Sequence, residues 1–196
     1  MERKVNVMNL VDIMVKNNWR NDTHFEFGTD KEFNHRYCTT FYDDEFKKYR
    51  QQENLRLLEI GVHRGGALAV FNEYFEDAEI YGVDAYDFGA KINCERWPRI
   101  KVIYADGYRK QFADSLPNFD IIIDDGPHTK ESHLQALEIY LPKLKRNGVF
   151  IIEDVVQMEW TEEYKKLVPE HMKWEIIDAR EISNMSDSIL FVVRYE

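Results

Sequence analysis

The most informative stretch of the sequence is Leu57-Leu58-Glu59-Ile60-Gly61-Val62-His63-Arg64-Gly65-Gly66. The apolar run from Leu55 to Ile60 is typical of a buried parallel strand. A glycine-bearing turn follows, and residues 67–75 then show a helical pattern. Open α/β sheets use this strand, turn and helix to bind nucleotide-like ligands at the carboxyl ends of their strands. We therefore expect a ligand site where the strand ends.

Glu59 indicates the charge of that ligand. It lies two residues before Gly61, where its carboxylate would face the ligand. A pyrophosphate would be repelled there, whereas the ammonium group of an amino-acid-like cofactor would be attracted. The glycines at 61, 65 and 66 also lack the G-x-G-x-x-G spacing of a dinucleotide site. The stretch favours S-adenosylmethionine over NAD as cofactor; the alternative is an ordinary turn that Glu59 merely caps.

Composition limits the classes of protein that need to be considered. A chain of 196 residues is most simply one domain. Its net charge of −10 and the lack of a basic block argue against nucleic acid or an anionic membrane as main partner. No apolar stretch approaches the roughly 20 residues of a membrane span, and the first 15 residues are too polar for a signal peptide. Cys38 and Cys94 lack metal-site spacing, so we expect a cytoplasmic protein with reduced thiols.

The N-terminal quarter of the chain precedes the strand pattern. Helical spacing predicts an amphipathic helix with an apolar face made of Val7, Leu10, Val11, Met14 and Val15. Residues 17–42 show no period but contain Gly28-Thr29-Asp30-Lys31 and His35-Arg36-Tyr37. They are interpreted as a packed functional loop, with a plain surface loop as the alternative. A charged helix is expected over 43–51. Residues 1–52 should form an extension to a core of residues 53–196, and the two parts should form one compact domain.

Strands and helices alternate through the rest of the chain. Further strands are predicted over 80–83, 101–104, 119–123, 149–152, 174–177 and 188–195. A helix should begin at the cap residue Thr129 and run to about residue 145; Pro142 should bend or end it early, and Asn147-Gly148 should close it. Another helix is expected over 159–167. This order predicts an α/β fold with a doubly wound, mostly parallel seven-stranded sheet of the Rossmann-like type.

Acidic residues end five of these strands: Glu59, Asp84, Asp106, Asp125 and the pair Glu153-Asp154. The ends of parallel strands share one edge of a sheet, which is where ligands bind. Asp84 would accept the two ribose hydroxyls of the cofactor, and Asp106 the adenine amino group. Tyr108 would stack on the adenine, with a core role as the alternative. Each acid could also be an ordinary turn residue, since aspartate is common in turns.

A second group of acids points to a metal ion. Asp125 and Glu153-Asp154 are one crossover apart, so we expect them on adjacent strands about 5 Å apart. Three carboxylates so close would raise each other's pKa unless a cation lay among them, and oxygen ligands suit Mg²⁺. Helix capping with a structural salt bridge is the alternative. His128, three residues after Asp125, would be the general base rather than a surface residue.

Four motifs resemble the class I S-adenosylmethionine-dependent methyltransferases: Leu58-Glu59-Ile60-Gly61, Gly82-Val83-Asp84, Ile122-Ile123-Asp124-Asp125-Gly126-Pro127-His128 and Ile152-Glu153-Asp154. The chain is most similar to the metal-dependent sugar O-methyltransferases of macrolide biosynthesis, the mycinamicin VI 2''-O-methyltransferase type. Their motif has serine where this chain has Pro127. The resemblance covers roughly residues 25–195 and extends to Gly28-Thr29-Asp30-Lys31, His35 and Tyr37.

The resemblance also implies roles for individual residues. It implies Mg²⁺ on Asp125, Glu153 and Asp154, His128 as base, and cofactor contacts from Glu59, Gly61, Asp84 and Asp106. Similar motifs occur in cephalosporin hydroxylase-like proteins, and the macrolide enzymes carry an additional N-terminal region, so the acceptor stays open.

We therefore predict Mg²⁺-dependent methyl transfer from S-adenosylmethionine to a hydroxyl of a sugar or sugar-bearing small molecule. The sequence is compatible with a homo-oligomer. The alternatives are a nicotinamide-dependent oxidoreductase and a non-catalytic module that binds S-adenosylmethionine or metal.

Overall fold

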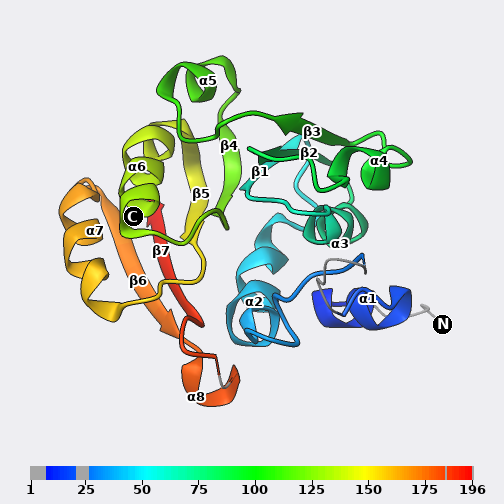
Figure 1. The fold of residues 1–196 in the computed structure, drawn as a ribbon, viewed down its shortest axis with the longest axis horizontal. Helices are drawn as coiled ribbons and strands as arrows, with labels where there is room; N and C mark the ends of the chain where they lie inside the picture. The colour runs from blue at the N-terminus through cyan, green and yellow to red at the C-terminus, as the bar shows by residue number, and fades with distance from the viewer. Residues whose placement is uncertain (1–7, 21–26, 184, 196) are drawn as a thin grey trace.

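A seven-stranded sheet runs through the centre of the molecule in the order β3-β2-β1-β4-β5-β7-β6 (Figure 1). This computed structural model describes residues 8–20, 27–183 and 185–195. The strands are β1 (Leu55–Ile60), β2 (Ala78–Asp84), β3 (Ile100–Tyr104), β4 (Phe119–Asp124), β5 (Leu144–Ile152), β6 (Met172–Asp178) and β7 (Ile189–Tyr195). The first five are parallel, and β7 is antiparallel to both β5 and β6. The predicted doubly wound, mostly parallel sheet is confirmed.

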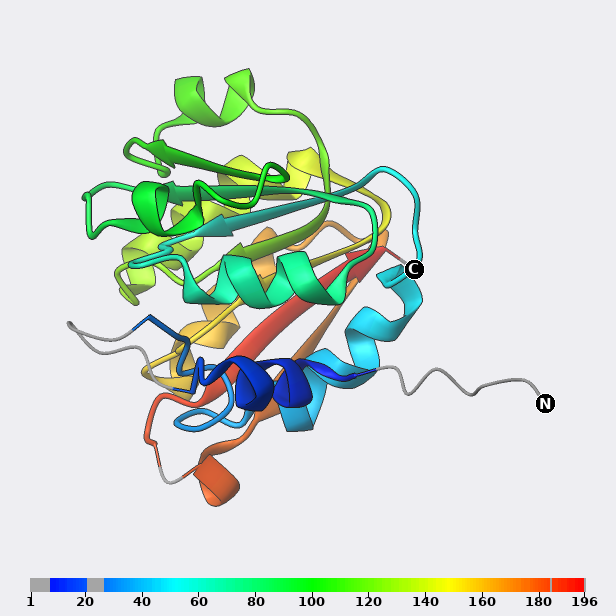
Figure 2. The same cartoon turned by 90° about the vertical axis from the view of Figure 1, so that its right-hand side faces the viewer.

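Helices cover both faces of the sheet (Figures 1 and 2). One face carries α1 (Leu10–Asn17), the π-helix η1 (Cys38–Tyr42), α2 (Asp43–Phe46), the 3₁₀ turn η2 (Lys47–Tyr49), α3 (Gly66–Tyr74) and α4 (Ala90–Cys94). The other carries α5 (Lys110–Ser115), α6 (Lys130–Tyr140), the 3₁₀ turns η3 (Leu141–Lys143) and η4 (Met158–Trp160), and α7 (Thr161–Leu167). The short helix α8 (Arg180–Ser183) follows β6.

Alternation along the strands explains why there are two hydrophobic cores. Successive side chains of a strand point to opposite faces of the sheet, so a strand buried on both sides must be apolar throughout. In β4, Ile121 and Ile123 pack on the α3 side, whereas Ile122 packs on the α6 side. This burial on both sides accounts for the continuous apolar runs from which the strands were predicted.

The N-terminal segment packs into the core on the α3 side. Leu10 and Ile13 of α1, Tyr42 of η1 and Phe46 of α2 are fully buried there. Val7, predicted on the first helix, and residues 21–26 of the predicted loop lie outside the described residues. Residues 8–20 and 27–52 thus share one hydrophobic core with the sheet.

The predicted ending of the helix after Thr129 is wrong in one detail. Thr129 caps α6 as expected, and the helix ends at Tyr140 because Pro142, in the following 3₁₀ turn, lacks a backbone N–H. Asn147 and Gly148 do not close this helix, because they lie within β5. Asn147 has a φ of 69°, and the pairing with β4 shifts register between Phe119 and Ile121. These residues produce an irregularity in a strand and not a helix end.

The membrane prediction can be compared only with the described residues. Every helix among them is too short or too polar to cross a bilayer.

His133 of α6 gives a test of the packing between α6 and α7. Its Nδ1 lies 2.8 Å from the hydroxyl oxygen of Tyr164, and burial lowers the pKa of His133 from 6.5 to about 3. Between these values only the unfolded chain takes up the proton, so stability is lost as the pH falls below about 6.5. From pH 7 to pH 5 this effect is about 2 kcal/mol at 1.36 kcal/mol per pKa unit.

Urea unfolding at pH 7 and pH 5 measures this loss. His133→Asn should have a lower free energy of unfolding than wild type at pH 7. Its loss of stability between pH 7 and pH 5 should be about 2 kcal/mol smaller than the loss in wild type. Equal pH dependence in the two proteins would contradict the assignment.

Candidate active site at the carboxyl edge of the sheet

A cavity of about 670 Å³ lies at the carboxyl ends of the central strands. Most residues predicted for the site line it: Glu59, Gly61, Asp84, Asp106, Tyr108, Asp125, His128 and Asp154. His63 also lines it, beside Phe88 at a ring separation of 4.9 Å. Glu153 lies behind the wall of the cavity and is 1% exposed. The structure thus brings the predicted cofactor residues and most of the predicted metal residues together around one space.

Two glycines allow the loops of the site to approach each other. Gly61 has a φ of 81°, and a β-carbon there would lie 2.0 Å from the carbonyl oxygen of Asp125. A β-carbon on Gly66 would lie 1.6 Å from the carbonyl oxygen of Gly28. Glycine is therefore required for the turn after β1 to contact both the loop after β4 and the segment that begins at Gly28.

Asp84 holds the turn after β1 against the end of β2. Its Oδ2 accepts hydrogen bonds from the backbone N–H groups of Val62 at 3.0 Å and His63 at 2.9 Å. Its Oδ1 accepts one from the backbone N–H of Tyr86 at 2.9 Å. A carboxylate oxygen has two lone pairs, so these bonds leave acceptor capacity for a ligand hydroxyl. Asp84 is both a structural residue of the turn and part of the cavity wall.

Tyr108 lies between the cavity and the core on the α6 side, and stacking on an adenine stays a prediction. Its ring lines the cavity, while its hydroxyl donates a hydrogen bond of 2.5 Å to Oδ1 of the fully buried Asp124. Burial, together with the negative charge of Asp125, raises the pKa of Asp124 to about 7. Asp106 accepts a hydrogen bond from the backbone N–H of Tyr108 at 3.1 Å, so the two residues form one unit after β3.

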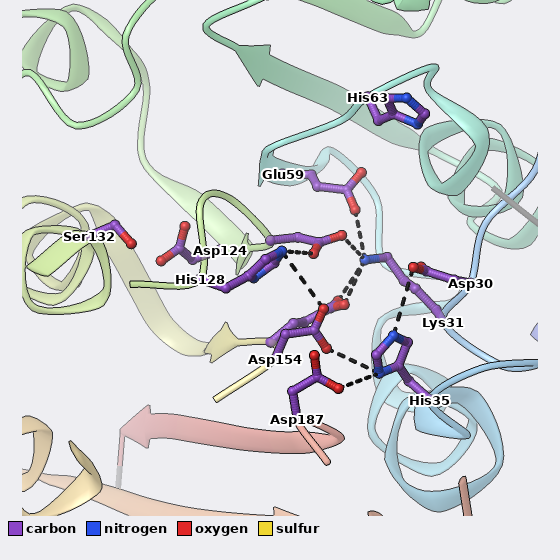
Figure 3. A network of polar contacts seen from close by, with 12 residues as sticks. Asp30, Lys31, His35, Glu59, His63, Asp124, His128, Ser132, Asp154 and Asp187 are labelled. Atoms are coloured by element: carbon purple, nitrogen blue, oxygen red, sulfur yellow. Dashed lines mark hydrogen bonds and ion pairs between the residues drawn. The ribbon is translucent and has the colours of Figure 1, made fainter. Parts of the chain in front are cut away.

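A buried lysine lies among the acids, and the sequence pattern did not assign it a role. The Nζ atom of Lys31 is 2.7 Å from Asp125 Oδ2, 2.8 Å from both carboxylate oxygens of Glu153 and 3.1 Å from Glu59 Oε1. Figure 3 shows its side chain reaching the acids from the N-terminal segment. Burial by itself lowers the pKa of Lys31, but the three carboxylates outweigh it and raise that pKa well above its usual value.

Lys31 also determines the surroundings of Glu59. Burial raises the pKa of Glu59 to about 7, although the neighbouring ammonium lowers it. Glu59 therefore has an internal cation as partner, where the sequence suggested the ammonium group of a cofactor. Whether Glu59 also contacts the cofactor stays a prediction.

Tyrosine hydroxyls contact Glu153 and Asp154. Tyr37 donates a hydrogen bond of 2.6 Å to Oδ1 of Asp154, and Tyr42 donates a short one to Glu153. His35 Nδ1 lies 3.2 Å from Asp154 Oδ1 and 3.0 Å from the hydroxyl of Ser188. Burial, and then the charge of Asp125, raises the pKa of Asp154 well above its usual value. Burial also raises the pKa of Glu153, with Lys31 acting in the opposite direction.

His128 lies in the loop that follows β4, and its imidazole faces two of the acids (Figure 3). Its backbone has a φ of 53°, and its Nε2 lies 3.8 Å from Asp125 Oδ1 and 3.8 Å from Asp154 Oδ2. One ligand atom from each of these residues lies within 4.8 Å of the others, close enough to share one ion. Carboxylate oxygens suit Mg²⁺, and a cation would offset the repulsion between the half-buried Asp125 and the buried Asp154. These residues therefore fit a divalent ion.

The residues that sequence reasoning missed all come from the segment 28–42. Lys31, Tyr37 and Tyr42 contact acids that lie about a hundred residues later in the chain. Lys31 and Tyr37 lie in the motifs Gly28-Thr29-Asp30-Lys31 and His35-Arg36-Tyr37, but no local periodicity indicates which residues they contact. Two signals indicated a functional loop: the aromatic and charged composition of 17–42, and the resemblance of residues 28–31, His35 and Tyr37 to the methyltransferase family.

Comparison with known proteins identifies the family. A methyltransferase domain family matches residues 58–155, which is half of the chain. The chain belongs to this family. The match begins in β1 and ends just after Asp154, so it includes every acid discussed above. It confirms the resemblance to the class I methyltransferases.

Curated relatives are methyltransferases of sugar groups. The chain is 32% identical to mycinamicin VI 2''-O-methyltransferase of Micromonospora griseorubida over 62% of this chain and 32% of the relative. It is 31% identical to 8-demethyl-8-alpha-L-rhamnosyl tetracenomycin-C 2'-O-methyltransferase of Streptomyces olivaceus, over 68% of this chain and 36% of the relative. The chain thus spans about a third of the length of these relatives.

Solved structures show the same fold. A MycE methyltransferase structure with Mg, SAH and mycinamycin VI has a TM-score of 0.63 and 28% identity, over 83% of this chain and 40% of that one. Another MycE structure, with Mg and SAH, has a TM-score of 0.72 over 96% of this chain and 54% of that one; at 22% identity it shows the fold alone.

Proposed function

We propose that this domain transfers a methyl group from S-adenosylmethionine to a hydroxyl of a sugar or sugar-bearing small molecule, with Mg²⁺ as the preferred cation. One observation carries the proposal. A single cavity contains both the turn fixed by Asp84 and the cluster of Asp125, His128 and Asp154. A methyl donor and an activated acceptor must meet in one site, and this cavity offers a place for each.

The cofactor would lie along the turn after β1. Asp84 and Asp106 are the proposed acceptors for the ribose hydroxyls and the adenine amino group, with the Tyr108 ring beside the base. Gly61 would keep the turn close to the cofactor. Relatives named as methyltransferases, and MycE structures with SAH, support this assignment.

The acceptor would lie beside His128. A divalent cation on Asp125 and Asp154 would lower the pKa of an acceptor hydroxyl. The imidazole of His128 would take the proton as the hydroxyl oxygen attacks the methyl group, because its Nε2 faces the space between the two carboxylates. Glu153 stays a predicted third ligand, and in the structure it contacts Lys31 and Tyr42. MycE structures with Mg support the choice of ion.

Family membership weakens the oxidoreductase alternative, and the non-catalytic alternative is tested by turnover. A methyl-transfer assay with sugar-bearing hydroxyl acceptors and S-adenosylmethionine should give S-adenosylhomocysteine and a methyl ether. No turnover with any acceptor, despite cofactor binding, would favour the non-catalytic module.

Cofactor binding can be measured without knowing the acceptor. Calorimetry should show binding of S-adenosylhomocysteine and none of NAD. Asp84→Ala should weaken binding by about 1.5–3 kcal/mol, the usual scale for hydrogen bonds to a charged group. Asp114→Ala, an exposed acid of α5 paired with Lys110, is the matched control and should bind like wild type. Tight NAD binding without a response to S-adenosylhomocysteine would contradict the proposal.

A further inference from the structure

The segment 28–42 supplies a hydrogen-bonding partner for each acid proposed or predicted to bind the cation. Lys31 contacts Asp125 and Glu153, Tyr42 contacts Glu153, and Tyr37 contacts Asp154. None of these three partners lines the cavity, so they stand behind the acids. Partners in this position fix the orientation of metal ligands, and their loss typically costs about 10–100-fold in metal affinity.

Tyr37 has the most specific geometry of the three. Its hydroxyl donates to Asp154 Oδ1 at 2.6 Å and accepts from the backbone N–H of Asp154 at 3.3 Å. The same hydroxyl lies 3.3 Å from the carbonyl oxygen of Asp187. One oxygen atom thus binds both the side chain and the main chain of Asp154, which fixes the side chain relative to its own backbone.

Asp154 also has an uncommon backbone conformation. Its φ of 53° lies in the left-handed region, which is uncommon for a residue other than glycine. With Oδ1 held by Tyr37, the other oxygen, Oδ2, is the one that lies 3.8 Å from His128 Nε2. His35 Nδ1 also lies 3.2 Å from Oδ1, but of the two residues Tyr37 makes the shorter contact and the one that also binds the Asp154 backbone.

We infer that Tyr37 is a positioning residue for the cation site, because it holds Asp154 in the orientation in which Oδ2 can bind the ion. This inference rests on the proposed function, since it assumes that Asp154 binds a cation. It extends that function to a residue outside the cavity, on an element far from Asp154 in the sequence.

The test is Tyr37→Phe, which removes only the hydroxyl. The ring is fully buried beside His35 at a centroid distance of 5.2 Å, so phenylalanine can fill the same space. Direct titration with Mn²⁺, followed by electron paramagnetic resonance of the free ion, should show a dissociation constant about 10–100-fold above wild type. S-adenosylhomocysteine affinity should change less than about twofold, because Tyr37 does not line the cavity.

Tyr49→Phe is the matched control. Tyr49 is also a buried tyrosine, and its hydroxyl donates a hydrogen bond of 2.7 Å to the carbonyl oxygen of Asn147, outside the cavity. Tyr37→Phe loses two hydrogen bonds and Tyr49→Phe loses one, so the melting temperature of each should fall, but Tyr49→Phe should bind Mn²⁺ like wild type.

Each result has a separate meaning. Equal Mn²⁺ affinity in the two variants would overturn the positioning role while leaving the proposed function intact. Equal losses of Mn²⁺ and S-adenosylhomocysteine affinity in Tyr37→Phe would also overturn it, because they would indicate general damage to the sheet edge. Absence of Mn²⁺ binding by the wild-type protein would refute the proposed cation site itself.

Discussion

The His128→Ala variant is expected to lose about 10²–10⁴-fold in kcat, the usual contribution of a positioned general base. The imidazole Nε2 faces the space between Asp125 and Asp154, and it is the proposed proton acceptor for the attacking hydroxyl. Binding of S-adenosylhomocysteine should persist, because the proposed cofactor contacts come from other residues. Steady-state kinetics of methyl transfer, with calorimetry of cofactor binding, measures both quantities.

Two further variants separate proton transfer from other effects. His128 has a left-handed backbone, which asparagine tolerates better than most residues, so His128→Asn tests whether backbone strain explains the loss. His128→Asn should be as inactive as His128→Ala. His171→Ala replaces an exposed histidine between α7 and β6 and should keep wild-type kcat. Wild-type turnover in either His128 variant would require another route for the proton.

Removal of divalent cations is expected to abolish methyl transfer, and added Mg²⁺ should restore it. Asp125 and Asp154 are the proposed ligands because one carboxylate oxygen of each lies within 4.8 Å of the other. Asp154→Asn and Asp125→Asn should each raise the Mg²⁺ concentration needed for half-maximal activity by at least about 10–100-fold. Loss of a residue that only supports a metal ligand typically has an effect of this size, and loss of a ligand itself should have at least as large an effect. Initial rates over a Mg²⁺ series after treatment with a chelator provide the measurement.

The same variants distinguish the cation site from the cofactor site. S-adenosylhomocysteine affinity should be nearly unchanged in Asp154→Asn, because Asp84 and Asp106 are the acids proposed to bind the cofactor. Asp114→Asn changes an exposed acid of α5 and should have the Mg²⁺ requirement of the wild type. Full activity in excess chelator would show that the cluster has only a structural role.

Much of the architecture could be predicted because its causes are local. The apolar run that forms β1 was predicted with the boundaries found, and Thr129 and Pro142 indicated where α6 begins and ends. The acids at the strand ends follow from the same logic, because parallel strands of a doubly wound sheet end at one edge. Asn147-Gly148 was misassigned because these residues are equally typical of a helix end and of an irregular strand, and only pairing with β4 distinguishes the two.

The succession of seven strands along the chain, the edge where the site lies and the acids that meet there could be predicted, since each depends on periodicity or on strand ends. Helices α4, α5 and α8 were not predicted. The contacts that hold those acids in place depend instead on tertiary packing. Lys31 lies 94 residues before Asp125 and 122 before Glu153, and Tyr37 lies 117 before Asp154. Contacts over such distances arise from the packing of the segment 28–42 on the finished sheet. A buried ammonium is favourable there only because three carboxylates lie within 3.1 Å of it in the folded protein.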